Sequence, residues 1–323
     1  MKINIQSRLL LNKLSAISKV VSNKNAYAIL DNFLFELTGG QLVITGSDME
    51  TRLTSVLDVP GAEGDGSFAI GIQRLIGLLK ELPDTALAIE VDNETQDVTI
   101  RYLNGQAKML ALPGEDYPAK AVSDGQQDVF TIASKDVYDA IEYTLFAAGT
   151  DEMHPQFMGI FWDVKPDMIT FVASDSHKLV RFVNARVKPG FERSFIMPIK
   201  PAQVLLQIIE KKSEEPVQIA VDATSATFTV GGFTLTCRFV NGRYPNYNTV
   251  IPRNNPYSVV VDRATILNAL RRVAISASVS GLVKMQLQNQ AIHMTTEDID
   301  HATGGEETIV CEYDGSEIGR AHV

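Results

Sequence analysis

Apolar residues recur along the chain with two spacings, one typical of helices and one typical of strands. Leu10, Leu14 and Ile17 are four and three residues apart, as on the buried face of an amphipathic helix. The segment 98–102, VTIRY, instead alternates apolar and polar positions, as a half-buried strand does. An Asn-Gly pair at 104–105 follows this strand and is typical of a tight hairpin turn. Helices and hairpins of this kind predict an α+β fold in which helices cover antiparallel sheets.

The same order of elements is repeated along the chain. Each full copy holds a helix-forming segment, alternating strands, a second helix-forming segment and a Tyr-Pro pair that closes it. Asp48 and Asp175 are 127 residues apart, and Pro118 and Pro245 are also 127 residues apart. Because two unrelated landmarks share one spacing, the repeated unit is a whole domain and not a short motif.

A third copy starts near residue 256 and stops early. Its helix-forming segment begins at Asp262, 127 residues after Lys135, where the second copy begins its own helix. The sequence ends GRAHV after the strands that follow, so about 50 residues of a full copy are not matched. We predict two helices on antiparallel sheets in each complete copy. The predicted domains are 1–120, 126–248 and 256–323, the third represented only by its N-terminal half.

Composition narrows the class of protein. Of the 323 residues, 45% are hydrophobic and 21% are charged, which is enough apolar material to form buried cores. No apolar run approaches the roughly 18 residues that span a bilayer, and the N-terminus lacks the apolar core of a signal peptide. Cys237 and Cys311 show neither a disulfide pattern nor metal-ligand spacing, so we expect buried free thiols. We therefore expect a cytoplasmic protein with no membrane partner, no cofactor and no metal.

The net charge of −10 would by itself argue against a nucleic-acid partner. Salt screens charges beyond about 8 Å, however, so a segregated set of basic residues could still attract DNA. The predicted helices carry such residues opposite their apolar faces, except the helix after Lys135, which is acidic. On any single helix such a face is more often ordinary solvated surface, so charge alone leaves a DNA contact undecided. The basic residues that recur on several helices include Arg74, Lys80, Lys200, Arg271 and Arg272.

Several motifs resemble those of the bacterial DNA polymerase III beta subunit family, the DNA sliding clamps. They are AILDNFLFEL at 28–37, TGSDMETRL at 45–53, LPGEDYP at 112–118, ASDSHKL at 173–179 and NGRYPNYNTVIP at 241–252. The resemblance extends from Met1 to about Gly319. It implies a DNA polymerase processivity factor without a catalytic site. Two subunits of three domains each would join head to tail in a ring that encircles duplex DNA.

The resemblance also implies the partners of the protein. Double-stranded DNA would pass through the ring without sequence recognition, since a sliding protein must contact phosphates and ignore bases. The replicative polymerase, the clamp loader and repair proteins would bind through short linear motifs. A second copy of the chain would complete a homodimer, located in the cytoplasm with the nucleoid.

The DNA-contacting residues follow from the resemblance and from the helix faces together. The loop 23–25 matches a DNA-contacting loop of the family's first domain, and the loop 154–156 matches its equivalent in the second. Without the family, these positions could equally be ordinary surface lysines and an ordinary turn. The predicted DNA contacts are Lys24, Arg74, Lys80, His154, Gln156, Lys200, Arg271 and Arg272.

A client-binding pocket between the second and third domains is also implied. Leu179, Pro245 and Val250 would form an apolar socket for the hydrophobic side chains of a peptide. Thr249 stands where relatives often have arginine, which leaves the peptide preference open. On the sequence alone, a packed domain junction explains these residues better than a pocket does. The full set is Phe157, Ser174, His177, Lys178, Leu179, Pro245 and Val250.

Ring closure in the family joins an edge strand of the first domain to the third domain. Ala107 and Met109 match the first side of this contact, and Val273 and Ile275 lie near the second. The incomplete third copy would leave exposed apolar surface and an unpaired sheet edge. We therefore expect reduced stability, weaker client binding and impaired ring closure for this polypeptide.

Enzymatic functions have weaker support in the sequence. The segment GGQLVITG lacks the lysine and hydroxyl residue that end a phosphate-binding P-loop. Asp175 and His177 lie in a predicted polar turn without a third ligand at metal spacing. His293 and His301, with their acidic neighbours, belong to the equivalent turn of the third copy. The competing function is a non-enzymatic repeat scaffold that binds proteins but not DNA.

Overall fold

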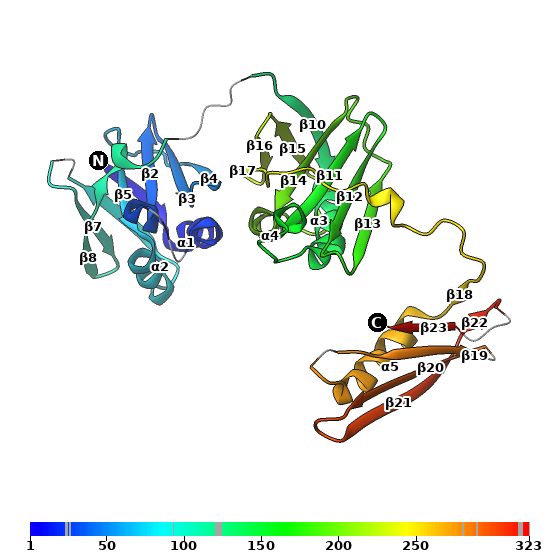
Figure 1. Cartoon of the computed structure of the whole chain (residues 1–323). Helices are drawn as coiled ribbons and strands as arrows, with labels where there is room; N and C mark the ends of the chain where they lie inside the picture. The colour runs from blue at the N-terminus through cyan, green and yellow to red at the C-terminus, as the bar shows by residue number, and fades with distance from the viewer. Residues whose placement is uncertain are drawn as a thin grey trace. The chain divides into compact units, whose positions relative to one another are not determined.

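The computed structural model describes residues 1–323 except 23, 24, 26, 93, 120–124, 280, 289, 316–318 and 323, with 319–322 described in their backbone only. The described residues form two compact units, which we name the N-terminal unit (Met1–Pro245) and the C-terminal unit (Asn246–Val323). Both combine helices with antiparallel strands (Figure 1). The predicted α+β fold is therefore confirmed.

The first copy occupies the start of the N-terminal unit, where the predicted apolar stripe is buried. Leu10, Leu14 and Ile17 of its first helix are fully buried, as their spacing requires. The elements are β1 (Lys2–Gln6), α1 (Ser7–Ile17), η1 (Ser18–Val20), η2 (Ala28–Asp31), β2 (Asn32–Thr38), β3 (Gln41–Ser47), β4 (Thr51–Asp58), β5 (Gly66–Gly71), α2 (Ile72–Glu81), β6 (Ala86–Val91), β7 (Asp97–Tyr102), β8 (Gly105–Leu110), β9 (Leu112–Pro113) and η3 (Gly114–Asp116).

The second copy repeats this order in the rest of the N-terminal unit. Trp162 is fully buried at its centre, with its ring 4.6 Å from that of Phe171 and 5.3 Å from that of Phe195. The elements are β10 (Asp128–Ala133), α3 (Ser134–Thr144), η4 (Leu145–Ala147), η5 (Pro155–Phe157), β11 (Gly159–Lys165), β12 (Met168–Ser174), β13 (Leu179–Asn184), β14 (Arg193–Pro198), α4 (Ile199–Ile208), β15 (Pro216–Val221), β16 (Ser225–Val230) and β17 (Phe233–Arg238).

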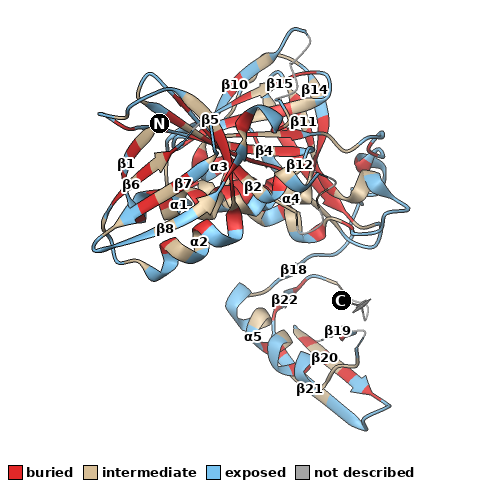
Figure 2. Ribbon diagram, turned by 90° about the vertical axis from the view of Figure 1, so that its left-hand side faces the viewer, coloured by how far each residue is buried: buried red, intermediate tan, exposed pale blue. Residues whose placement is uncertain are grey.

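A single sheet joins the two copies. Its strand order is β10-β15-β16-β17-β4-β3-β2-β5-β9, so β17 of the second copy pairs with β4 of the first. The pairing is antiparallel and places Phe233 opposite Ser55 and Cys237 opposite Thr51. Two four-stranded sheets, β1-β6-β7-β8 and β13-β12-β11-β14, complete the unit. The buried residues gather where the helices meet these sheets, and the outward face of α2 is exposed (Figure 2).

The C-terminal unit holds the third copy, with a small core of its own. Ala269, Val273, Met294 and Ile309 are buried together there. Its elements are η6 (Tyr247–Thr249), β18 (Val259–Val260), α5 (Arg263–Val273), η7 (Ala274–Ser276), β19 (Lys284–Gln288), β20 (Ala291–Asp298), β21 (Thr303–Val310), β22 (Glu312–Tyr313) and β23 (Gly319–His322). The strand order β21-β20-β19-β23 leaves β21 at one end of its sheet.

One turn explains why the same aspartate recurs in all three copies. Oδ1 of Asp48 accepts the backbone N–H of Thr51 at 2.7 Å, and Oδ1 of Asp175 accepts that of Lys178 at 2.9 Å. Oδ1 of Asp298 accepts the backbone N–H of His301 at 3.2 Å. An aspartate that bonds its own backbone two or three residues ahead replaces a ladder hydrogen bond at a tight turn. The repeated Asp therefore has a structural origin.

Candidate functional site

The polar face of α1 and α2 carries exposed basic residues. Arg74 and Lys80 are exposed on α2, and Lys19 is exposed where α1 passes into η1. A groove of about 540 Å³ lies between these helices and is lined by both lysines, by Gln73 and by the acidic Asp31. Lysines interleaved with uncharged hydrogen-bonding groups suit contact with phosphate oxygens and carry no base-reading geometry.

Lys200 is held by an acidic partner from the first copy. It lies in the first turn of α4, and its Nζ is 2.5 Å from Oδ2 of Asp48. The pair ties α4 to the end of β3, so it joins the two copies in addition to the pairing of β4 with β17. Lys200 therefore contributes to the contact between the two copies. The sequence did not predict this role for the lysine.

The two predicted DNA-contacting loops differ in what the structure describes. Lys24 lies outside the described residues, although its neighbour Asn25 donates from Nδ2 to Oδ1 of Asp31 at 2.7 Å. Nδ1 of His154 is 2.9 Å from Oδ2 of Asp151, and this bond lowers the pKa of that carboxyl. Gln156 follows in η5 and is half-buried. The histidine side chain thus faces an aspartate within its own loop.

The two arginines at the end of α5 are placed differently. Arg271 and Arg272 are both exposed in the last turn of the helix. Nε of Arg272 donates to Oε2 of Glu307 at 2.9 Å, across to β21. This bond raises the pKa of Arg272 and lowers that of Glu307. Arg272 is thus hydrogen-bonded to a strand of its own unit, whereas Arg271 is exposed in the same turn of the helix.

One predicted client-pocket residue of the N-terminal unit, Phe157, belongs to an aromatic cluster. Phe157 meets the ring of Tyr244 edge to face at 5.9 Å, and Phe161 stacks on the same ring at 4.6 Å. Leu179 begins β13 and is half-buried, while Pro245 is exposed beside Tyr244. Tyr244 and Phe161 were not among the predicted residues. The signal that could have found Tyr244 is its position in the repeated Tyr-Pro pair, next to Pro245.

The polar residues of this surface are fixed in the repeated turn. Oγ of Ser174 donates to the carbonyl oxygen of Lys178 at 2.8 Å. The Lys178 ammonium bonds the Asp175 carboxylate, and together with backbone N–H groups it holds the pKa of Asp175 well below its usual range. His177 is exposed at the tip of the turn. The turn therefore presents a rigid polar rim next to Leu179.

Val250 belongs to the C-terminal unit, where it is 66% exposed. It follows η6, whose Thr249 donates its hydroxyl to the carbonyl oxygen of Asn246 at 2.7 Å. This segment thus presents an apolar side chain to solvent, as a binding residue must before its ligand arrives.

The four predicted dimer residues have three different environments. Ala107 and Met109 lie half-buried on β8, the last strand in the order of its sheet. Val273 is only 3% exposed and belongs to the core of the C-terminal unit. Ile275 lies in the middle of η7 and is 83% exposed. Val273 therefore supports the helix end from inside, and Ile275 is the residue that a partner could contact.

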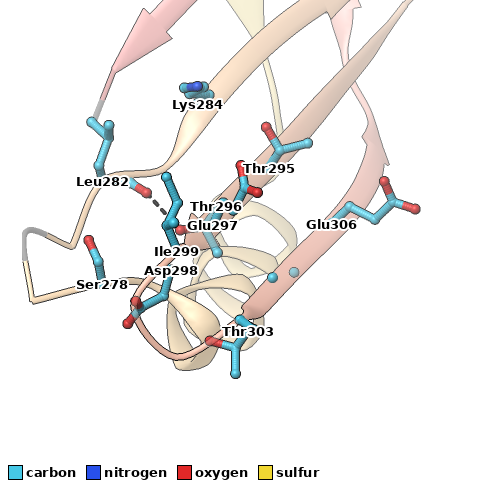
Figure 3. Close-up of a pocket in the computed structure, with 13 residues that line it drawn as sticks. Ser278, Leu282, Lys284, Thr295, Thr296, Glu297, Asp298, Ile299, Thr303 and Glu306 are labelled. Carbon is cyan, nitrogen blue, oxygen red and sulfur yellow. Dashed lines mark hydrogen bonds between the residues drawn. The ribbon is translucent and has the colours of Figure 1, made fainter.

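A hollow of about 1000 Å³ opens in the C-terminal unit beside the β20–β21 hairpin (Figure 3). Its wall includes Leu282, whose carbonyl oxygen accepts the hydroxyl of Thr296 at 2.8 Å. Asp298 lies at the end of the hairpin and also receives Nδ1 of His301 at 3.0 Å. Within the part of the chain that the structure describes, no three His, Cys, Asp or Glu residues are arranged to hold a metal ion. The carboxylate of Asp298 is thus hydrogen-bonded within its own turn.

A repeated helix-on-sheet domain, joined to its neighbour by a continuous sheet and carrying basic helix faces, defines a clamp-like scaffold. No helix in the described ranges has both the length and the apolar composition to cross a membrane. Comparison with known protein families identifies this scaffold more specifically. Family models of the DNA polymerase III beta subunit match all three copies, its N-terminal domain at residues 1–121, its central domain at 131–246 and its C-terminal domain at 248–321.

Individual relatives agree with the family models. The beta sliding clamp of Pseudomonas aeruginosa is 27% identical over 98% of this chain and 86% of its own length. Its crystal structure with griselimycin superposes with a TM-score of 0.91 at 26% identity, covering all of this chain and 86% of that one. The Bacillus subtilis clamp, at 22% identity, shares the fold with a TM-score of 0.93. The chain belongs to the DNA polymerase III beta subunit family, the sliding clamps, and is accordingly a non-catalytic processivity subunit.

Proposed function

We propose that this clamp closes its ring, in spite of the impaired closure expected from the incomplete third copy, by pairing β8 of one subunit with β21 of a second subunit. The observation that carries the proposal is the junction already present within the N-terminal unit, where β17 pairs with β4. β8 is the counterpart of β17 in the first copy, and β21 is the counterpart of β4 in the third. Both strands stand at the ends of their sheets among the described residues, so each offers a free ladder of backbone groups.

We propose the register of this contact by analogy with the internal junction. β8 aligns with β17 through their hairpin turns, so Gly105 corresponds to Phe233, and β21 aligns with β4 through their first residues. Transferring the observed pairs places Ala107 opposite Gly305 and Met109 opposite Thr303. Lys108 then lies diagonal to Glu306, within reach of a cross-strand ion pair. Small inward residues and opposite outward charges both favour this register.

The helices repeat the same relation on the other side of the sheet. Within the N-terminal unit, η1 contacts α4, and Lys200 of α4 reaches Asp48. The counterpart of η1 is η7 with its exposed Ile275, and the counterpart of α4 is α2 of the second subunit. The counterpart of Asp48 is Asp298 at the hollow of the C-terminal unit. We propose that Ile275 packs on α2 of the second subunit, while the hollow receives the start of that helix.

The DNA contact is proposed to centre on helix residues that have no carboxylate partner among the described residues. Arg74, Lys80 and Arg271 are exposed, whereas Lys200 and Arg272 have carboxylate partners. A paired lysine can still contact a phosphate, but it must share its charge, so its contribution to counterion release is smaller. The loops that contain Lys24 and His154 complete the proposed DNA surface.

Lys80→Ala is expected to lower the salt dependence of DNA binding. Loss of one phosphate contact reduces the slope of log K against log salt by about 0.9 per contact. The matched control is Lys188→Ala, which removes an exposed lysine from the loop before β14 and should leave the slope unchanged. Fluorescence anisotropy with duplex DNA at several salt concentrations measures both. Equal slopes for the two variants would remove α2 from the DNA surface.

The aromatic cluster beside Leu179 is proposed as the socket for client peptides. Tyr244, Phe157 and Phe161 form its apolar base, and the turn around Asp175 forms a polar rim. Rigid aromatic groups next to fixed hydrogen-bonding groups suit an apolar anchor in an extended peptide. Clamps of Pseudomonas aeruginosa and Bartonella birtlesii have been crystallised with griselimycin, which supports a ligand site on this fold.

We further propose domain boundaries of 1–120, 126–248 and 256–323 and a cytoplasmic location at the nucleoid. The repeat spacing and the ranges matched by the three family models support these boundaries. A ring that encloses DNA has its place where the chromosome is.

A further inference from the structure

The client socket of the second copy has a counterpart in the first. Because β2 and β11, β3 and β12, and β5 and β14 match in length and order, each residue of one socket has an equivalent in the other. Tyr244 corresponds to Tyr117 in the repeated Tyr-Pro pair. Leu179 corresponds to Arg52, and both lie at the start of the strand that follows the repeated turn. The chain therefore carries two related surfaces with different residues at the same place.

The base of the first surface is built from smaller residues. Leu30, Leu34, Ala69 and Tyr117 form a buried cluster there. Their equivalents around Tyr244 include the larger rings of Phe157 and Phe161, which pack on the Tyr244 ring. Smaller base residues leave more room above them, so another group must occupy that space for the surface to be well packed.

Arg52 lies beside Tyr117 of this cluster. Its guanidinium carbon lies 5.8 Å from the centre of the Tyr117 ring, and its Nη2 donates to the carbonyl oxygen of Pro118. Burial lowers the pKa of Arg52, while the nearby Tyr117 and Glu36 raise it. The same burial raises the pKa of Tyr117 to about 12. The arginine is therefore a packed, hydrogen-bonded part of this surface, unlike a freely solvated side chain.

Leu179 cannot make either of these interactions. It has no donor for the carbonyl oxygen of Pro245, and it is half-buried beside the polar turn. An apolar peptide side chain can therefore pack on Leu179 without breaking a hydrogen bond. On the first surface the same peptide would have to displace a charged group from an aromatic ring and from a carbonyl oxygen, which disfavours binding.

We propose that Arg52 closes the first copy to client peptides, so that each chain offers a single client site. The inference rests on the client pocket proposed above. Arg52 acts as a specificity-determining residue because it occupies one of two equivalent surfaces and leaves the other open. Confining clients to one surface per chain gives each bound polymerase one defined position on the clamp.

The test uses the full chain and a fluorescein-labelled peptide that carries leucine and phenylalanine side chains. Titration followed by anisotropy should give about one peptide per chain for the unmodified protein and about two for Arg52→Leu. In a Leu179→Asp background, Arg52→Leu should restore binding of about one peptide. Thr54→Leu adds the same side chain two residues along β4 and is the matched control, with no added site expected.

The outcomes separate this inference from the client pocket. Failure of the unmodified chain to bind the peptide would count against the pocket, whereas binding by Arg52→Leu in the Leu179→Asp background reports on Arg52 alone. Unchanged stoichiometry in Arg52→Leu, or two sites in the unmodified chain, would overturn the role of Arg52. If Arg52→Leu melts at a much lower temperature, Arg52→Met preserves the length of the side chain without its charge and gives the same comparison.

Discussion

Ile275→Asp is expected to convert the dimer into monomers. The side chain is 83% exposed on η7, so the monomer should fold normally. In the dimer, however, the aspartate would be buried against α2 of the second subunit. Burying an unpaired carboxylate at the centre of an interface costs about 3 kcal/mol or more, which raises the dissociation constant at least ~100-fold. Sedimentation velocity across a concentration series measures this shift.

The control for this experiment places the same charge elsewhere on the C-terminal unit. Val260 is 60% exposed on β18, which pairs with β22 and has no counterpart at the junction of β17 with β4. Val260→Asp should therefore sediment as the unmodified chain does. A stable dimer in Ile275→Asp, or equal dissociation in both variants, would place the ring contact elsewhere.

Leu179→Asp is expected to weaken client binding by roughly 30-fold or more. The substitution puts a carboxylate on the strand position opposite Ser174, beside the turn of Asp175, where an apolar anchor would have to desolvate it. Loss of a central anchor residue typically costs 2 kcal/mol or more, or roughly a 30-fold loss of affinity. Isothermal titration with griselimycin, which the Pseudomonas aeruginosa clamp binds in its crystal structure, measures the effect.

The matched control for the socket is Leu112→Asp. This leucine lies on β9 of the first copy and is 40% exposed, so it tests the same substitution outside the second copy. Griselimycin should bind this variant as it binds the unmodified chain. Equal affinity of Leu179→Asp and Leu112→Asp would show that the ligand sits away from the cluster of Tyr244.

The sequence predicted those features that local chemistry determines. The aspartate of the repeated turn bonds its own backbone, so a local motif was sufficient to locate it in all three copies. The apolar stripe of α1 likewise needed only helical spacing. The α+β class followed from these local signals and is confirmed by the structure and by the family.

Features that depend on contacts between distant segments were not predicted. Lys200 and Asp48 are far apart in sequence and meet only because β17 joins β4, so the lysine could not be recognised as paired. Val273 was predicted at the dimer surface, although it lies four residues after the buried Ala269 and shares its core-facing side of α5. The helical spacing of this pair could have indicated that Val273 points inward, with Ile275 left for the partner.

The charge pairs also change how the net charge should be interpreted. Several basic residues of the helix faces bond carboxylates within the chain, including Lys200 with Asp48 and Arg272 with Glu307. The attraction to DNA therefore depends on fewer unpaired cations than the sequence suggested. A weak phosphate contact of this kind is compatible with sliding, because persistence on DNA comes from enclosure and not from affinity.

Retention on circular DNA tests the central claim most directly. The full chain is loaded by its clamp loader onto a nicked circular plasmid and then separated from free protein by gel filtration in high salt, before and after a restriction enzyme linearises the plasmid. A closed ring should stay on the circular plasmid, because salt weakens phosphate contacts but not topological linkage, and should slide off the linear one. Equal loss from circular and linear DNA would contradict enclosure.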